Sequence, residues 1–105
     1  MGGETFTNRA TGKDVQEAFD NAHNQACYNY GNSGYSGSLA EKDSYIVITP
    51  SAEFQDDESK VRFSEHLIDE RDERVDDKWG PAGAIRLADN SSGLQVWLFF
   101  GWASA

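Results

Sequence analysis

The sequence LQVWLFFGWA, residues 94–103, decides the fold. Its side chains alternate between two faces of an extended strand, and both faces carry large apolar residues. Upstream, residues 82–88 also have the composition of a strand. The linker Asp-Asn-Ser-Ser-Gly at 89–93 is typical of a tight connection between antiparallel strands. The C-terminal quarter of the chain therefore predicts a β-hairpin.

One face of this last strand carries Trp97 and Phe99. We expect these two side chains to point outward. Exposed aromatic residues are favoured anchors at protein interfaces, so both are candidates for contact with a partner. The alternative is that the helices cover this face and leave the opposite one to solvent. Which face the helices cover decides between the two interpretations.

Working back along the chain, Tyr45–Thr49 is β-branched, aromatic and apolar on both faces, which predicts a central strand that Pro50 ends. Shorter strands are expected at 5–7, broken by the turn at 10–12, and at 38–41. A seven-residue stretch with three glycines, 31–37, predicts a turn-rich loop with Tyr35 near its tip.

Two amphipathic segments predict helices. The first runs from about 12 to 29, with the small residues Ala18, Ala22 and Ala26 on the side that approaches a sheet. The second begins near Asp56 or Asp57 and is expected to continue to Gly80-Pro81, a typical helix stop. Its inward stripe is narrow and consists of Val61, Ser64, Ile68, Arg71, Val75 and Trp79.

The order strand, helix, two strands, helix, two strands predicts the α+β class. We expect a single domain over residues 1–105, since a chain of this length can bury one core. Its predicted sheet is antiparallel or mixed, with four to five strands and both helices on one face, as in a ferredoxin-like sandwich with one strand added.

Acidic residues dominate the charge balance: 18 Asp and Glu against 9 Lys and Arg give a net charge of −9. Such a surface repels nucleic acid and anionic membranes, so neither is expected as a direct partner. The longest apolar run, 96–100, is too short to span a bilayer, and the N-terminus lacks the pattern of an export signal. With Cys27 as the one cysteine, these features predict a cytoplasmic protein.

The acidity is concentrated: eleven of the eighteen acidic residues fall between Glu53 and Asp77. A solubility role, adaptation to high salt, and a surface for a basic partner all explain it. The partner hypothesis assigns the contact to the second helix. Its predicted partner-binding residues are Asp69, Glu70, Asp72, Glu73, Asp76 and Asp77, with Tyr35, Trp97 and Phe99 as further contact candidates.

No catalytic motif is complete. Asp20, His23 and Cys27 share one side of the first helix, but a thiolate nucleophile or a zinc site needs further groups, and an ordinary helix-flank contact explains the spacing. Neighbouring carboxylates on a helix diverge by about 100° and do not form a calcium loop. The glycine-rich stretches match no phosphate-binding motif. We therefore expect no cofactor, no bound metal and no enzymatic activity.

Three segments together, 30–39, 78–82 and 99–103, resemble uncharacterised small proteins encoded by phages and other mobile elements. None of the matching positions is a catalytic signature, so no residue role is carried over. The resemblance implies a phage-type inhibitor, in the manner of anti-CRISPR proteins, some of which imitate the charge of nucleic acid.

The leading hypothesis is thus a non-enzymatic binding module whose acidic helix meets a basic, nucleic-acid-handling protein. A second is a homo-oligomeric structural protein that associates through the aromatic C-terminal strand, with a homodimer as its simplest form. The third is a small enzyme that uses His23 and Cys27.

Overall fold

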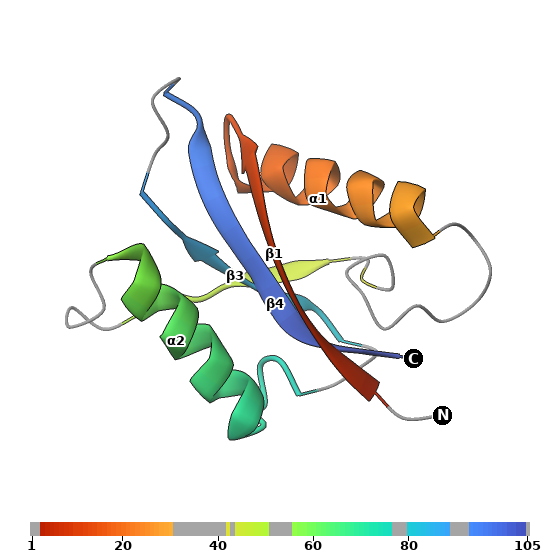
Figure 1. The fold of residues 1–105 in the computed structure, drawn as a ribbon, viewed down its shortest axis with the longest axis vertical. Coiled ribbons are helices and arrows are strands. Elements are labelled where there is room, and N and C mark those ends of the chain that lie inside the picture. The colour runs from red at the N-terminus through yellow and green to blue at the C-terminus, as the bar shows by residue number, and fades with distance from the viewer. Residues whose placement is uncertain are drawn as a thin grey trace.

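The computed structural model describes residues 3–30, 42, 44–50, 56–76, 80–88 and 93–104. Within these residues it has four strands and two helices (Figure 1). In order these are β1 (Gly3–Gly12), α1 (Val15–Tyr30), β2 (Tyr45–Val47), α2 (Asp57–Asp69), β3 (Ala82–Arg86) and β4 (Gln95–Ser104). The predicted strand at 38–41 lies outside the described residues.

The four strands form one mixed sheet in the order β1-β4-β3-β2. β4 pairs antiparallel with both β1 and β3, which confirms the predicted hairpin and places the aromatic strand at the centre of the sheet. β2 pairs parallel with β3, and α2 makes the crossover between them. The α+β class is thereby confirmed. β1 is longer than predicted, because its pairing with β4 continues through residues 10–12, where a break was expected.

The prediction that both helices lie on one face is wrong. α1 packs with Phe6, Trp97 and Phe99 on one side of the sheet, whereas α2 packs with Leu98 and Phe100 on the other. The sheet is thus sandwiched between the helices (Figure 1). This three-layer arrangement differs from a ferredoxin-like sandwich. It explains why β4 is apolar on both faces, since each face is covered by a helix.

The segment at Tyr45–Thr49 does form a strand, but the prediction of a central position is wrong. β2 comprises three residues at the edge of the sheet, and Ile46 and Val47 are partly exposed. Its apolar character on both sides has the same cause as that of β4. Tyr45 packs against Phe19 of α1, with ring centroids 5.0 Å apart, while Ile48 lies in the cluster beneath α2.

α1 agrees closely with its prediction. The side chain of Asp14 accepts a hydrogen bond from the Glu17 amide at 2.9 Å and so caps the start of the helix. Ala18, Ala22 and Ala26 are buried against the sheet as expected. These small side chains let the helix lie close to the sheet.

α2 ends about ten residues earlier than predicted. It closes in a Schellman motif, in which the Arg71 amide donates to the Ile68 carbonyl and the Asp72 amide donates to the Leu67 carbonyl. Arg71 takes a positive φ of 53°, a conformation that usually selects glycine. The chain then turns back so that Val75 enters the core beneath α2, where it is 1% exposed. Of the predicted stripe, Arg71 is exposed, and Trp79 lies outside the described residues.

Candidate protein-binding site

Five carboxylates follow one another at the end of α2 and in the turn after it. We call this segment the acidic turn and define it by Asp69, Glu70, Asp72, Glu73 and Asp76. Four of these residues are exposed, and Asp72 is half-buried. Only Asp69 is helical, with Glu70 as the C-cap. The acidic surface is therefore a turn at a helix end, and α2 does not continue into the described residues 70–76, where a helix was predicted.

The backbone of the acidic turn is fixed at both ends. Besides the Schellman bonds, the amides of Val75 and Asp76 both donate to the Asp72 carbonyl, each at 2.9 Å. Val75 then anchors the segment in the core. A turn that is hydrogen-bonded internally and held by a buried side chain loses little conformational freedom when a partner binds.

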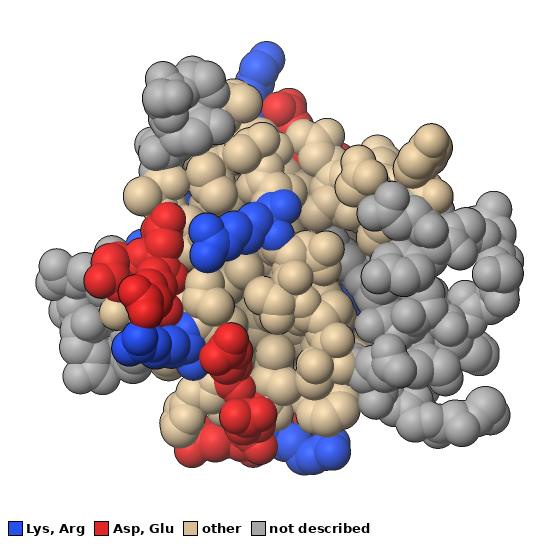
Figure 2. All heavy atoms as spheres, viewed as in Figure 1, with Lys and Arg blue, Asp and Glu red and all other residues tan. Residues whose placement is uncertain are grey.

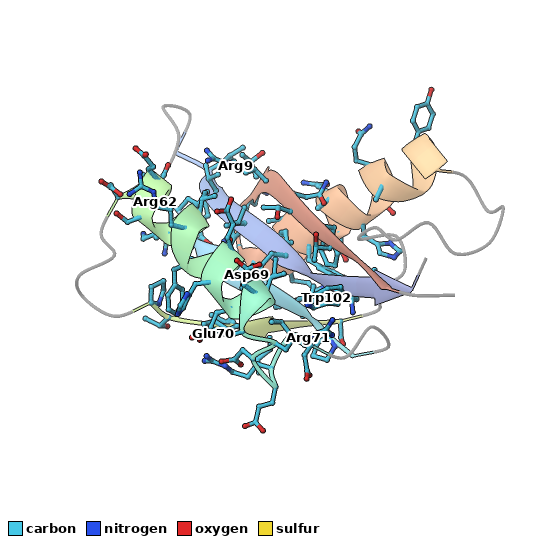
Figure 3. All side chains as sticks on the ribbon, turned by 60° about the horizontal axis from the view of Figure 1, so that its bottom comes forward. Arg9, Arg62, Asp69, Glu70, Arg71 and Trp102 are labelled. Carbon is cyan, nitrogen blue, oxygen red and sulfur yellow. The ribbon has the colours of Figure 1, made fainter. Side chains whose placement is uncertain are left out.

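Trp102 of β4 supports the beginning of the turn (Figure 3). Its indole Nε1 donates to the Ile68 carbonyl at 3.3 Å. The guanidinium carbon of Arg71 lies 4.4 Å from the centroid of the same ring, which is the geometry of a cation–π contact. This contact holds the Arg71 side chain against Trp102 of β4. Sequence reasoning missed the pair, because Arg71 and Trp102 are distant in the chain.

Asp72 and Arg74 form the firmest ion pair of the acidic turn. The Arg74 side chain donates from Nε and Nη2 to the two oxygens of Asp72, at 2.8 and 3.0 Å. The Arg74 amide also donates to Asp72 Oδ1 at 3.0 Å. These hydrogen bonds lower the pKa of Asp72 from 3.8 to about 2. Asp72 is thus the carboxylate whose hydrogen bonds hold the conformation of the acidic turn.

The lowered pKa of Asp72 predicts a pH dependence of stability. A carboxyl group whose pKa is lower in the folded state stabilises that state above pH 4, and this contribution is lost as the pH falls towards 2. We expect Asp72→Asn to reduce the free energy of unfolding at pH 6 by about 1 kcal/mol or less, because solvent screens a partly exposed pair. Urea denaturation of both proteins at pH 6 and pH 2 measures this difference, which should nearly vanish at pH 2. An equal difference at both pH values would contradict the charge-based explanation.

Trp97 and Phe99 are not available as contact residues. Trp97 is 7% exposed and Phe99 is fully buried, both in the cluster beneath α1. The expectation that they point outward is wrong, and the alternative, burial under a helix, is correct. β4 also lies inside the sheet, paired with β1 along its length and with β3 through residues 97–100, so it is not an edge strand. Tyr35 and Asp77, the remaining predicted contacts, lie outside the described residues.

The residues considered for catalysis do not form a described centre. His23 is half-buried, and its ring stacks on Phe19 with centroids 5.8 Å apart. Asp20 is exposed and accepts a hydrogen bond from Gln16 at 3.0 Å. The side chain of Cys27 is outside the described set. In the parts of the chain that are described, His, Cys, Asp and Glu side chains do not gather in groups of three that could hold a metal ion.

One buried charge was not anticipated from the sequence. Lys42 is 1% exposed, and its Nζ donates to the Gly80 carbonyl at 2.9 Å. A buried ammonium group must be compensated by acceptors, and this bond ties the segment before β2 to the start of β3. No pattern around position 42 distinguishes this lysine from a surface residue.

Two further findings concern membrane insertion and similarity to known proteins. Neither described helix has the length and apolar character needed to cross a bilayer. No family model, curated protein or solved structure matches this chain.

Proposed function

We propose that this chain is a non-enzymatic, cytoplasmic binding module that presents the acidic turn to a basic surface on a partner protein. The observation that carries the proposal is the fixed backbone of the turn, combined with the exposure of its carboxylates. A solvated acidic face serves solubility in any conformation, whereas a site for recognition needs its charges in fixed places. Preorganisation of charge is therefore the property that favours binding over solubility.

The distribution of charge supports the same proposal. In Figure 2 acidic side chains gather along α2 and at its lower end, with basic side chains among them. Between Asp56 and Asp76, nine acidic residues outnumber four Lys and Arg residues. Concentrated charge of one sign attracts a basic partner at long range and speeds the encounter. On this proposal the partner handles nucleic acid, and the turn occupies part of a groove that otherwise receives phosphates. A chain that occupies such a groove would inhibit its partner, and the resemblance to small phage proteins supports this role. Neither a cofactor nor a metal takes part in it.

The test compares two charge-reversal variants with equal net charge. One carries Glu73→Lys and Asp76→Lys in the acidic turn, and the control carries Asp20→Lys and Glu58→Lys, on α1 and α2 away from the turn. Each variant changes the net charge from −9 to −5. Both are used beside the wild type as bait in a lysate of the source cells at low salt. Affinity for a captured partner is then measured against salt concentration.

We expect the acidic-turn variant to bind at least about tenfold more weakly than wild type, a loss of about 1.4 kcal/mol, and the control to lose much less. The wild-type affinity should also fall as salt rises, because salt screens exposed charges. Equal losses in both variants would mean that net charge and not the turn governs binding. If both variants bind like wild type, the acidic turn is not the contact surface.

A further inference from the structure

We propose that the outer edge of β1, which pairs with no other strand among the described residues, pairs with β1 of a second copy of this chain and joins two sheets across a twofold axis. β1 is the longer of the two edge strands, with ten residues against three in β2. Its register with β4 is unbroken from end to end, so no bulge twists the edge away. The strand contains no proline and no lysine. Monomeric proteins commonly use bulges, prolines and lysines in their edge strands to block edge-to-edge pairing.

The hydrogen-bonding pattern shows which residues face the outer edge. The Leu87 amide donates to the Val96 carbonyl at 2.8 Å, so the main-chain groups of Val96 point toward β3. In antiparallel strands these groups alternate in direction, so those of Trp97 and Phe99 point toward β1. Their partners in β1 are Ala10 and Asn8. The amides and carbonyls of the odd-numbered residues of β1 therefore point outward.

A side-chain contact confirms this direction and limits the free segment. Asn21 of α1 donates from Nδ2 to the Thr11 carbonyl at 2.9 Å, so this outward carbonyl is already occupied. The outward groups that remain toward the start of the strand include those of Thr5, Thr7 and Arg9. This segment is centred on Thr7. It is also exposed, since the side chains of all three residues are accessible to solvent.

A second copy fits this segment by symmetry. An antiparallel pair centred on Thr7 places Thr7 opposite its own copy and Thr5 opposite Arg9 of the partner. All three positions then exchange main-chain hydrogen bonds, and the two arginines do not face each other. Such a contact uses the same surface on both copies, as a closed twofold dimer requires.

The charge of the strand favours a second copy over a basic peptide. β1 carries one acidic and one basic residue, Glu4 and Arg9, in a chain whose net charge is −9. α2, which carries much of the acidity, packs against β3 and β4. Two copies can therefore meet along nearly neutral strands, whereas a basic peptide would gain little at this edge. This inference is independent of the proposed role of the acidic turn.

The test is the molar mass in solution, measured by light scattering over a range of concentrations. The wild type is expected to approach twice its monomer mass of 11.6 kDa at high concentration. Thr7→Pro removes an outward amide without breaking a bond to β4, so the variant should fold and remain a monomer. Thr7→Ala keeps that amide and should dimerise like the wild type. A wild type that stays monomeric at every concentration overturns the proposal, as does a Thr7→Pro variant that still dimerises.

A second measurement decides the matter if Thr7→Pro does not fold. In a Cys27→Ala background, Thr7→Cys places two thiols opposite each other at the proposed axis, within the range of a disulfide. Mild oxidation should give covalent dimers of this variant. The control variant, Asn24→Cys at an exposed position on α1, should give few. Equal cross-linking of both variants, or none at position 7, rules out this edge as the interface.

Discussion

Phe99→Ala is expected to destabilise the protein by about 3–5 kcal/mol, the range for removing a large aromatic side chain from a core. Phe99 is fully buried on the central strand. Its ring lies 5.5 Å from that of Phe19 and 6.3 Å from that of Tyr45, measured between centroids. The substitution therefore removes a side chain that packs against both α1 and β2. Against a total stability of about 5–15 kcal/mol for a typical domain, such a loss leaves little margin.

Urea denaturation, followed by circular dichroism, measures the change in the free energy of unfolding. Tyr28→Ala is the matched control, because Tyr28 is also aromatic but is 86% exposed on α1. We expect this control to change stability by about 0.5 kcal/mol or less. A loss below about 1 kcal/mol for Phe99→Ala would show that this ring does not carry the packing of α1 on the sheet.

Gly83→Ala is expected to cost about 1–3 kcal/mol through overpacking, although it adds one methyl group. A Cβ atom at Gly83 would lie 2.5 to 2.9 Å from three atoms of the Phe100 ring. Phe100 is fully buried in the cluster beneath α2, so its ring has little room to move. The absence of a side chain at position 83 is thus what lets the aromatic ring of β4 lie against β3.

A double-mutant cycle with Phe100→Leu isolates this contact. A leucine side chain is smaller than the phenyl ring that it replaces, so Gly83→Ala should cost much less in that background than in the wild type. The free energies of unfolding of the four proteins give the coupling between the two positions. Additive costs would mean that the strain from Gly83→Ala arises elsewhere.

Alternation in the C-terminal strand predicted the hairpin correctly, and the same pattern also bears on the placement of the helices. Val96, Leu98 and Phe100 alternate with Trp97 and Phe99, and a strand that is apolar on both faces needs cover on both. The same reasoning applies to the segment at 45–49, which is apolar on both sides although it lies at the edge of the sheet. This signal was sufficient to place the two helices on opposite faces. The interpretation of Trp97 and Phe99 as exposed contacts was wrong for the same reason.

The end of α2 could not be predicted locally. Residues 69–75 contain good helix formers and no glycine or proline, and their charges also suit a helix. The helix ends because Val75 packs into the core. Trp102, far along the chain, also contributes: its ring makes a cation–π contact with the Arg71 guanidinium, and its indole N–H donates to the Ile68 carbonyl. These contacts offset the conformational cost of Arg71 at a positive φ. Tertiary packing therefore outweighs helix propensity here, and it converts a predicted acidic helix into a fixed acidic turn.

The sequence by itself determined the α+β class, α1 with its small buried face, the C-terminal hairpin and the concentration of negative charge. These features depend on periodicity, turn chemistry and composition, which are local properties of the chain. The tertiary structure decided the order of the strands, which of the two faces each helix covers, the shape of the acidic turn and the edge position of β1. Each of these depends on which distant residues meet, and side-chain periodicity carries no information about pairing between strands that lie far apart in the chain.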